Sequence, residues 1–158
     1  APFRKALQRS DPTQATLPYL DCVNNQASGA IQIYLEVLLQ TQEMRTAGLA
    51  PYLLAQSEYS DAAYWTIAQL IAHHTSNGCN LTAGDLFGTG TLSGSTPESA
   101  GSLLELSQGG KASISLPSGQ TRTFLEDGDT VIMNAFCAHE NAVRIGFGQC
   151  INTVVASH

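Results

Sequence analysis

Two residues that could do chemistry lie in one glycine-rich stretch, residues 84–110, with the sequence GDLFGTGTLSGSTPESAGSLLELSQGG. This stretch holds seven of the chain's 14 glycines. Gly88 and Gly90 carry no Cβ, so the backbone amides there and the hydroxyl of Thr91 are accessible. Glycine alternates with small or apolar residues over residues 84–94, and this pattern predicts a strand with one face open to a ligand.

Glu105 is the second candidate, because it lies between leucines in the sequence GSLLELS, residues 101–107. A buried carboxylate must be paired or hydrogen-bonded, since burying it alone costs free energy. The alternative is a strand from which Glu105 simply points outward, and the pattern alone does not separate the two. A phosphate cradle is a weaker interpretation of the glycines, since the lysine of a P-loop and the GxGxxG order are both absent.

His73, His74 and Cys79 lie close together and raise the possibility of a metal site. Their spacing matches no common zinc pattern, and adjacent side chains of a helix diverge by about 100°. We therefore expect structural roles for them. The cysteines are too sparse for a disulfide scaffold. We expect reduced and mostly buried thiols, which favours a cytoplasmic setting, at four positions: Cys22, Cys79, Cys137 and Cys150.

Composition limits the classes of protein to which the chain can belong. Of its 158 residues 43% are hydrophobic and 13% are charged, which is typical of a globular domain. The net charge of −6 with seven basic residues argues against nucleic acid or an anionic membrane as a partner. No apolar run approaches the roughly 20 residues of a membrane span. The N-terminus has no signal-peptide pattern, and the missing initial methionine suggests a processed chain or a fragment.

The first half of the chain predicts two strands after an extended lead-in over residues 1–20, which contain three prolines. Residues 30–41 alternate between apolar and polar side chains, as in a strand with one buried face. Ile31, Ile33, Leu35 and Val37 would form the apolar face. A connection follows, and residues 52–59 are predicted to form a second strand.

Residues 60–80 contain the clearest local signal, that of a helix. Ser60 or Asp61 is expected to cap its N-terminus, and Gly78 can take the left-handed conformation that ends a helix. The apolar residues follow helical spacing and predict one buried stripe. On that stripe, a buried histidine is more often a hydrogen-bonded core residue than a catalyst. The stripe consists of Ala63, Ile67, Leu70, Ile71 and His74.

The C-terminal third predicts strands joined by tight turns. Residues 112–125 form an expected hairpin with its turn at Pro117 to Gly119, and residues 126–129 form a second turn. Strands are expected at residues 130–137, 143–150 and 151–156, where Gly146 and Gly148 permit a bulge. The chain is thus predicted to be a single unit over residues 1–158, mostly β with one principal helix.

Several of these segments resemble the C-terminal part of the fumarylacetoacetase family. They are YWTIAQLIAHHTSNGCNLTAGDLFGTGTLSG, GSLLELS, GQTRTFLEDGDTVIMNAFC and RIGFGQC. The resemblance extends from LPYL at residue 17 to near the end of the chain, and is poor over residues 24–51. It implies a catalytic domain of mixed β-roll or sandwich type whose upstream part is absent from this chain, and a homodimer.

The resemblance also implies an activity, the hydrolysis of a carbon–carbon bond in 4-fumarylacetoacetate to give fumarate and acetoacetate. A divalent cation, Mg²⁺ or Ca²⁺, would bind the oxygens of the diketo acid. A histidine held by a glutamate would activate water. Glu105 matches that catalytic glutamate, and Thr91 matches the threonine that binds the carboxylate end of the substrate.

The remaining functional residues of the family have no counterparts here. The general-base histidine, the acidic metal ligands and several substrate-binding residues belong to the region upstream of the matched segments. His73 and His74 match a helical pair and not the base, and Asp85, Asp127 and Asp129 match turn positions. We therefore expect the isolated chain to be inactive or part of a larger enzyme. A binding module without catalysis, or a dimerisation unit, is the alternative.

Overall fold

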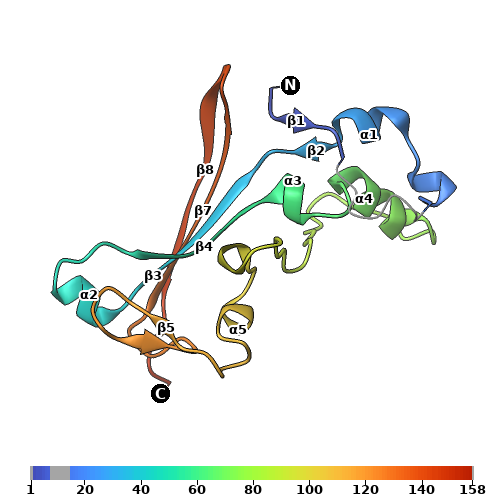
Figure 1. Cartoon of the computed structure of the whole chain (residues 1–158). Helices are drawn as coiled ribbons and strands as arrows, with labels where there is room; N and C mark the ends of the chain where they lie inside the picture. Colours follow the sequence, from blue (N-terminus) through green and yellow to red (C-terminus); the bar gives the residue numbers. More distant parts are fainter. Residues whose placement is uncertain (1, 8–14, 158) are drawn as a thin grey trace.

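A four-stranded antiparallel sheet forms the centre of the computed structural model, which describes residues 2–7 and 15–157 (Figure 1). Two smaller sheets of two strands each accompany it. The prediction of a mostly β chain with one principal helix is confirmed only in part, since the described residues form sheets with a few short helices. The large sheet has the strand order β4 (Tyr52–Glu58), β3 (Tyr34–Gln40), β7 (Thr130–His139), β8 (Ala142–Thr153). The small sheets pair β1 (Arg4–Lys5) with β2 (Ala30–Ile31), and β5 (Ile114–Ser115) with β6 (Thr121–Arg122).

The helical segments are short. In the described ranges no helix is both long and apolar enough to cross a membrane. Two of the helical segments in the described residues are 3-10 turns, η1 (Pro18–Leu20) and η2 (Pro97–Ser99). The α-helices are α1 (Val23–Ser28), α2 (Gln42–Thr46), α3 (Tyr59–Ala62), α4 (Ile67–Thr75) and α5 (Leu103–Leu106).

The lead-in and the first predicted strand are both interrupted. Of the lead-in, residues 1 and 8–14 lie outside the described residues, and the rest includes β1 and η1. The strand expected over residues 30–41 divides into β2 and β3, because β2 pairs with β1 whereas β3 pairs with β4 and β7. The chain changes partners at Gln32, whose N–H donates to the carbonyl of Phe3 at 2.9 Å.

The predicted helix over residues 60–80 is wrong in its first part. The chain leaves the helical conformation at Ala63 (φ −85°, ψ 121°) and α4 begins only after Thr66. The Thr66 hydroxyl accepts from the Gln69 N–H at 3.2 Å, and the Gln69 side chain accepts from the Thr66 N–H at 3.1 Å. This reciprocal cap, rather than Ser60 or Asp61, starts the helix. At its other end Gly78 has φ +86°, as expected.

The burial predicted for the helical stripe is confirmed at Ala63 and in part at Leu70, but it is wrong at the other three positions. Ile67 and Ile71 are about two-fifths exposed, and His74 is exposed, whereas Gln69 is buried. The reason is a polar contact: the Gln69 amide donates to the carbonyl of Leu20 at 3.2 Å and turns this face of α4 toward η1. A buried, hydrogen-bonded glutamine cannot be recognised from apolar spacing alone.

Both predicted turns of the C-terminal third are confirmed. The hairpin β5–β6 is shorter than residues 112–125, and Gly119 has φ +86° in its turn. The two strands expected at residues 143–150 and 151–156 are replaced by one continuous strand, β8, which ends at Thr153. Its partner register shifts between Asn134 and Phe136, opposite Gly148 at φ +82°, so the expected bulge is present.

The glycine-rich stretch does not form the predicted strand. Residues 84–94 have no regular secondary structure, and Glu105 lies in the helix α5 rather than on a strand. Ser102 caps this helix, because its hydroxyl accepts from the Glu105 N–H at 3.2 Å. Neither alternative for Glu105, burial among leucines or outward alternation along a strand, describes the structure.

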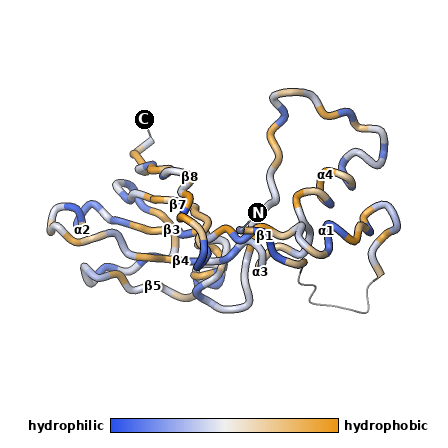
Figure 2. The backbone as a smooth tube through the Cα atoms, turned by 90° about the horizontal axis from the view of Figure 1, so that it is seen from above, coloured by the Kyte–Doolittle hydropathy of each residue, from blue (hydrophilic) through white to orange (hydrophobic). Residues whose placement is uncertain are grey.

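The buried core is small and lies where α2 and the β5–β6 hairpin meet the sheet (Figure 1). Leu39, Met44 and Leu116 form it, and each is at most 5% exposed. Many other large apolar side chains are exposed, above all in β8 and in the loop that follows α4. The backbone of this loop arches away from the helix (Figure 2). All four cysteines are free, but the expectation that they are mostly buried is wrong, since only Cys137 is.

Candidate functional site

Thr91 lies over the face of the large sheet that the sequence predicted to be apolar. A hollow of about 250 Å³ separates the irregular segment 89–92 from β3 and β4. Leu35 and Val37 contribute side chains from β3, which is the face expected from the alternation. Thr91 is exposed in this hollow, and Gly90 beside it has φ +76°, a conformation that favours glycine.

Gly101 closes the hollow on its other side and makes a tight crossing with the Thr91 segment. A Cβ added at Gly101 would lie 2.4 Å from the carbonyl oxygen of Leu92 and 2.6 Å from Cγ2 of Thr91. Only a residue without a side chain fits there. Gly88, by contrast, has open space around it. The glycine that the close approach requires is therefore Gly101, which the sequence did not single out.

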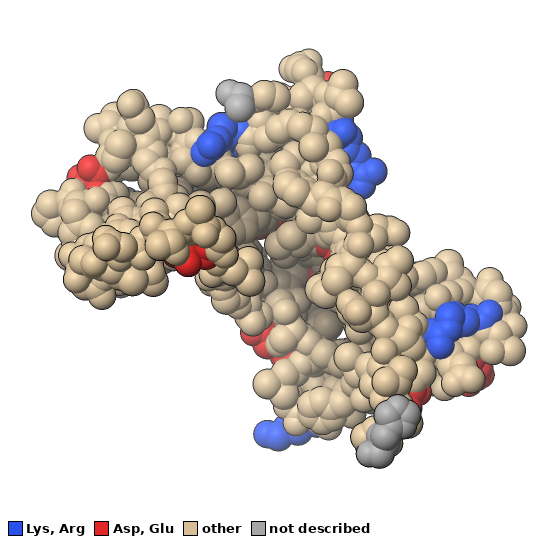
Figure 3. Space-filling model, turned by 180° about the vertical axis from the view of Figure 1, so that it is seen from behind, with Lys and Arg blue, Asp and Glu red and all other residues tan. Residues whose placement is uncertain are grey.

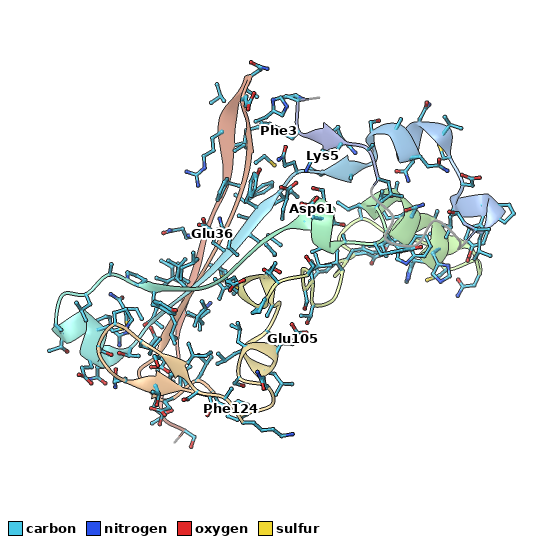
Figure 4. All side chains as sticks on the ribbon, viewed as in Figure 1. Phe3, Lys5, Glu36, Asp61, Glu105 and Phe124 are labelled. Atoms are coloured by element: carbon cyan, nitrogen blue, oxygen red, sulfur yellow. The ribbon has the colours of Figure 1, made fainter. Side chains whose placement is uncertain are left out.

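Glu105 reaches the same crossing from α5 (Figure 4). Its Oε2 accepts from the Ser93 hydroxyl at 2.6 Å and from the Gly101 N–H at 3.0 Å. The Gly101 N–H also lies 3.2 Å from the Ser93 oxygen. Among the described residues no hydrogen bond reaches Oε1, and the Glu105 side chain is exposed. One carboxylate oxygen is thus fixed and the other faces outward.

Thr91 and Glu105 therefore meet at one point of the fold, the backbone of Gly101. Thr91 packs against Gly101, and Glu105 accepts from its N–H. An apolar hollow of about 200 Å³ continues from Gly101 between α5 and the sheet, and is lined by Leu103 and Met133 among others. The sequence predicted both chemical residues but neither their common neighbour nor Ser93.

A polar hollow of about 440 Å³ adjoins the same segment, between residues 93–99 and the end of β4. The carboxylates of Glu58 and Asp61 line it. Lys5 lies beside them, with Nζ 2.6 Å from Glu58 Oε1 and 3.7 Å from Asp61 Oδ1 (Figure 4). Sequence reasoning missed this cluster, because Lys5 and Glu58 are 53 positions apart and each is an ordinary charged residue.

The charges in this cluster influence one another. Burial alone would raise the pKa of Glu58, but hydrogen bonds from Lys5 and Ser60 bring it below its ordinary value. The hydrogen bond to Glu58 is the main reason that the pKa of Lys5 is raised. Elsewhere the basic side chains are few, and they form separate small groups rather than a continuous patch on the face shown in Figure 3.

The two helical histidines have different partners. His73 Nδ1 lies 2.9 Å from the Tyr19 hydroxyl, and the two rings stack. His74 Nε2 lies 3.4 Å from the sulfur of Cys79, and its ring meets the edge of Phe87. Within residues 2–7 and 15–157 no group of three or more His, Cys, Asp or Glu side chains could hold a metal ion.

The turn aspartates stabilise local structure. Asp129 is fully buried, and its two oxygens accept from Arg122 at 2.8 and 3.0 Å. Asp85 accepts from the N–H and the hydroxyl of Thr82 at 2.9 and 3.1 Å. Neither residue faces the hollow that Thr91 lines.

Comparison with known proteins places these segments in a family. Residues 48–155 match the family model described as fumarylacetoacetate (FAA) hydrolase C-terminal. The chain is 44% identical over 154 residues to fumarylacetoacetase of Rattus norvegicus, covering 98% of this chain and 34% of the relative. Against fumarylacetoacetase of Oryza sativa subsp. japonica the identity is 43% over 154 residues, with 98% and 33% covered.

A third relative gives the same result. Fumarylacetoacetase of Dictyostelium discoideum is 40% identical over 146 residues, covering 91% of this chain and 33% of the relative. The chain thus spans about a third of the length of these relatives. The resemblance found in the sequence is confirmed, and the chain belongs to the fumarylacetoacetate hydrolase family, within the C-terminal part that the family model describes.

Proposed function

We propose that the protein hydrolyses a carbon–carbon bond of 4-fumarylacetoacetate to give fumarate and acetoacetate, and that this chain carries part of the active site. The names of its relatives support the reaction class. The observation that carries the proposal is the meeting of Thr91 and Glu105 at Gly101, beside a hollow on the sheet. Two residues 14 positions apart are thereby brought to one place where a small molecule could lie.

In this proposal Glu105 orients the histidine that acts as general base. A positioning carboxylate needs a fixed orientation and one free oxygen to accept from the imidazole N–H. Glu105 has both, since Ser93 and Gly101 hold Oε2 and no described residue bonds Oε1. The histidine itself would come from a part of the protein outside this chain. Ser93 is then a positioning residue that acts through Glu105.

Thr91 would bind a carboxylate end of the substrate. Its exposed hydroxyl can donate to a carboxylate oxygen, and the left-handed turn at Gly90 leaves the neighbouring backbone uncovered. The apolar hollow beyond Gly101 would accommodate carbon atoms of a diketo acid. The polar hollow near Glu58 is a poorer match to that substrate, because its carboxylates would repel an anionic acid.

A divalent cation, Mg²⁺ or Ca²⁺, belongs to this chemistry as the family resemblance describes it. Bound to the diketo oxygens, it would spread the negative charge that develops when the carbon–carbon bond breaks. The described residues of this chain do not fit such a site, since they contain no suitable group of ligands. The ligands of the cation are therefore proposed to lie outside this chain.

We also propose that the chain is inactive alone, and that its complete protein is a cytoplasmic homodimer of the β-roll or sandwich type that the resemblance implies. Exposed apolar side chains support the proposal that this chain associates with another protein surface. In β8, a strand at the edge of the sheet, Val143 is 87% and Phe147 62% exposed. The same observation favours the second candidate function, a dimerisation module. A stable monomer in sedimentation of the isolated chain would contradict that candidate.

A binding module without catalysis is the remaining alternative, and calorimetry separates it from the partial enzyme. The isolated chain is titrated with a non-hydrolysable diketo acid in the presence and absence of Mg²⁺. Because the cation ligands are proposed to lie elsewhere, we expect no cation-dependent binding by this chain alone. Tight binding that requires Mg²⁺ would show that the chain holds a complete site.

The catalytic proposal is tested by Glu105→Gln in the complete protein. Glutamine keeps the size of the side chain and can still accept from Ser93, but it cannot stabilise a charged imidazole. We expect kcat for 4-fumarylacetoacetate to fall by on the order of 10²-fold with a much smaller change in KM. Glu98→Gln, at an exposed glutamate of η2, is the matched control and should leave both constants unchanged. Equal kcat for Glu105→Gln and the parent protein would refute the role.

A further inference from the structure

A thiol and an imidazole meet just beyond the end of α4, away from the Thr91 hollow. The sulfur of Cys79 lies 3.4 Å from Nε2 of His74. Both side chains are exposed, so a reagent from solution can reach them. Local structure fixes the pair: Gly78 turns the chain at φ +86°, and the Cys79 N–H donates to the Asn77 side chain at 3.0 Å.

A carboxylate, that of Asp85, lies in the vicinity of His74. The carboxylate of Asp85 is held by Thr82 through two hydrogen bonds. These bonds lower the pKa of Asp85, and the charge of nearby His74 acts in the same direction. The contact that matters is that of the thiol with the imidazole, since a thiol within hydrogen-bond distance of an imidazole is the arrangement that activates cysteine nucleophiles, in which the imidazole takes the thiol proton.

We propose that Cys79 is a covalent modification site for soft carbon electrophiles of the activated-alkene class. The Cys79 sulfur forms a bond to the β-carbon while the π bond of the alkene breaks, and the electron pair moves to the α-carbon. The thiol proton passes to His74 Nε2 and is then delivered to the α-carbon, so no oxidant or reductant is needed. Neither Thr91 nor Glu105 takes part, and the inference does not depend on the proposed hydrolase reaction.

The other three cysteines lack this arrangement and serve as internal comparisons. Cys22 is exposed and has no imidazole partner among the described residues. Cys150 is exposed, and its sulfur accepts from the Asn152 amide at 3.3 Å, a group that cannot take a proton. Cys137 is buried, and burial raises the pKa of its thiol. Exposure alone would therefore make three thiols equivalent, whereas the His74 contact distinguishes one.

The test uses N-ethylmaleimide, an activated alkene, on the folded full-length protein near neutral pH. Labelling of each cysteine is followed in time by mass spectrometry of its peptide. We expect Cys79 to react at least about tenfold faster than Cys22 and Cys150, as general-base assistance to a nucleophile would give. Equal rates for the three exposed thiols would overturn the proposal.

Two histidine variants locate the cause. His74→Gln cannot take the thiol proton and is expected to slow Cys79 labelling to the Cys22 rate. The control, His73→Gln, changes the neighbouring histidine that contacts Tyr19 instead, and should leave Cys79 unchanged. Slow labelling of Cys137 in the same samples verifies that each variant is folded. A Cys79 rate unaffected by His74→Gln in a folded sample would contradict the proposal.

Discussion

Two regions of this molecule differ in how they hold a carboxylate. At the α2 end of the sheet Asp129 is fully buried and paired in two contacts with Arg122, which is itself 7% exposed. At the Gly101 crossing Glu105 is exposed, and neutral groups hold one of its oxygens. The first carboxylate is completely satisfied and stabilises the fold. The second keeps an oxygen free, which is what a positioning role in catalysis requires.

The surroundings of the two carboxylates differ in the same way. Near Asp129, Arg45 donates to the Gly128 carbonyl at 2.7 Å and to the Thr130 hydroxyl at 2.6 Å, and thereby ties α2 to the turn before β7. Near Glu105, the approaching chain over residues 76–91 is almost entirely exposed and without regular structure. Several contacts between distant segments thus fix the surroundings of Asp129, whereas the candidate site rests on a few hydrogen bonds.

Removing the buried carboxylate should have the largest effect on stability. Asp129→Ala removes the buried partner of the Arg122 guanidinium and leaves it only the exposed carboxylate of Glu126, and we expect it to lower the free energy of unfolding by about 3–5 kcal/mol. Urea denaturation measures this. The matched control is Asp127→Ala in the same turn, at an exposed position, with an expected change within about 0.5 kcal/mol. Similar urea midpoints for Asp129→Ala and Asp127→Ala would contradict the stabilising role of Asp129.

The Gly101 crossing should be more tolerant but still sensitive. Gly101→Ala places a methyl group 2.4 Å from the Leu92 carbonyl oxygen, so the backbone must move. We expect a loss of stability of about 1–3 kcal/mol and, in the complete protein, a fall in kcat/KM because Thr91 is displaced. Gly88→Ala, in open space, is the control and should change neither. Full activity of Gly101→Ala would show that the crossing does not position Thr91.

The Lys5–Glu58 pair should have the smallest effect on stability, and this effect should depend on pH. Because the folded pKa of Glu58 lies below its ordinary value of 4.5, its stabilising contribution is present above that pH and is lost as the pH falls through the folded value. We expect about 1 kcal/mol or less, since Lys5 is a third exposed. Unfolding free energies measured from about pH 7 to pH 3 should therefore fall less for Glu58→Gln than for the parent protein. Parallel curves would contradict this assignment.

Glycine-dependent local structure could be predicted from the sequence. The turns at Gly119 and Gly128 and the bulge at Gly148 all have positive φ, which few other residues adopt readily. That Leu35 and Val37 share one face of β3 was also predicted correctly, because the period of two is a property of any strand. The expected one-sided burial was wrong, since residues on both faces of β3 are partly buried. The two candidate residues were also predicted. Thr91 was singled out by the glycines around it and Glu105 by the leucines beside it, and the family resemblance supported both.

Features decided by distant contacts could not be predicted. The break before α4 depends on Thr66, whose hydroxyl also interacts with Asn25, 41 positions earlier. The Lys5–Glu58 pair likewise joins distant positions. The segment over residues 84–94 has strand-like alternation but pairs with no strand of the described residues, so the pattern led to a wrong prediction. Ser93 was overlooked for a related reason: a serine among glycines carries no signal until the fold places Glu105 beside it.

The measurement that tests the central claim most directly is a double-mutant cycle on kcat in the complete protein. It compares Ser93→Ala, Glu105→Gln and the variant that carries both. If Ser93 acts only by holding Oε2 of Glu105, Ser93→Ala alone should slow turnover by about tenfold, and adding it to Glu105→Gln should cause little further loss. Effects that multiply in the double variant would contradict the account, because Ser93 and Glu105 would then act independently.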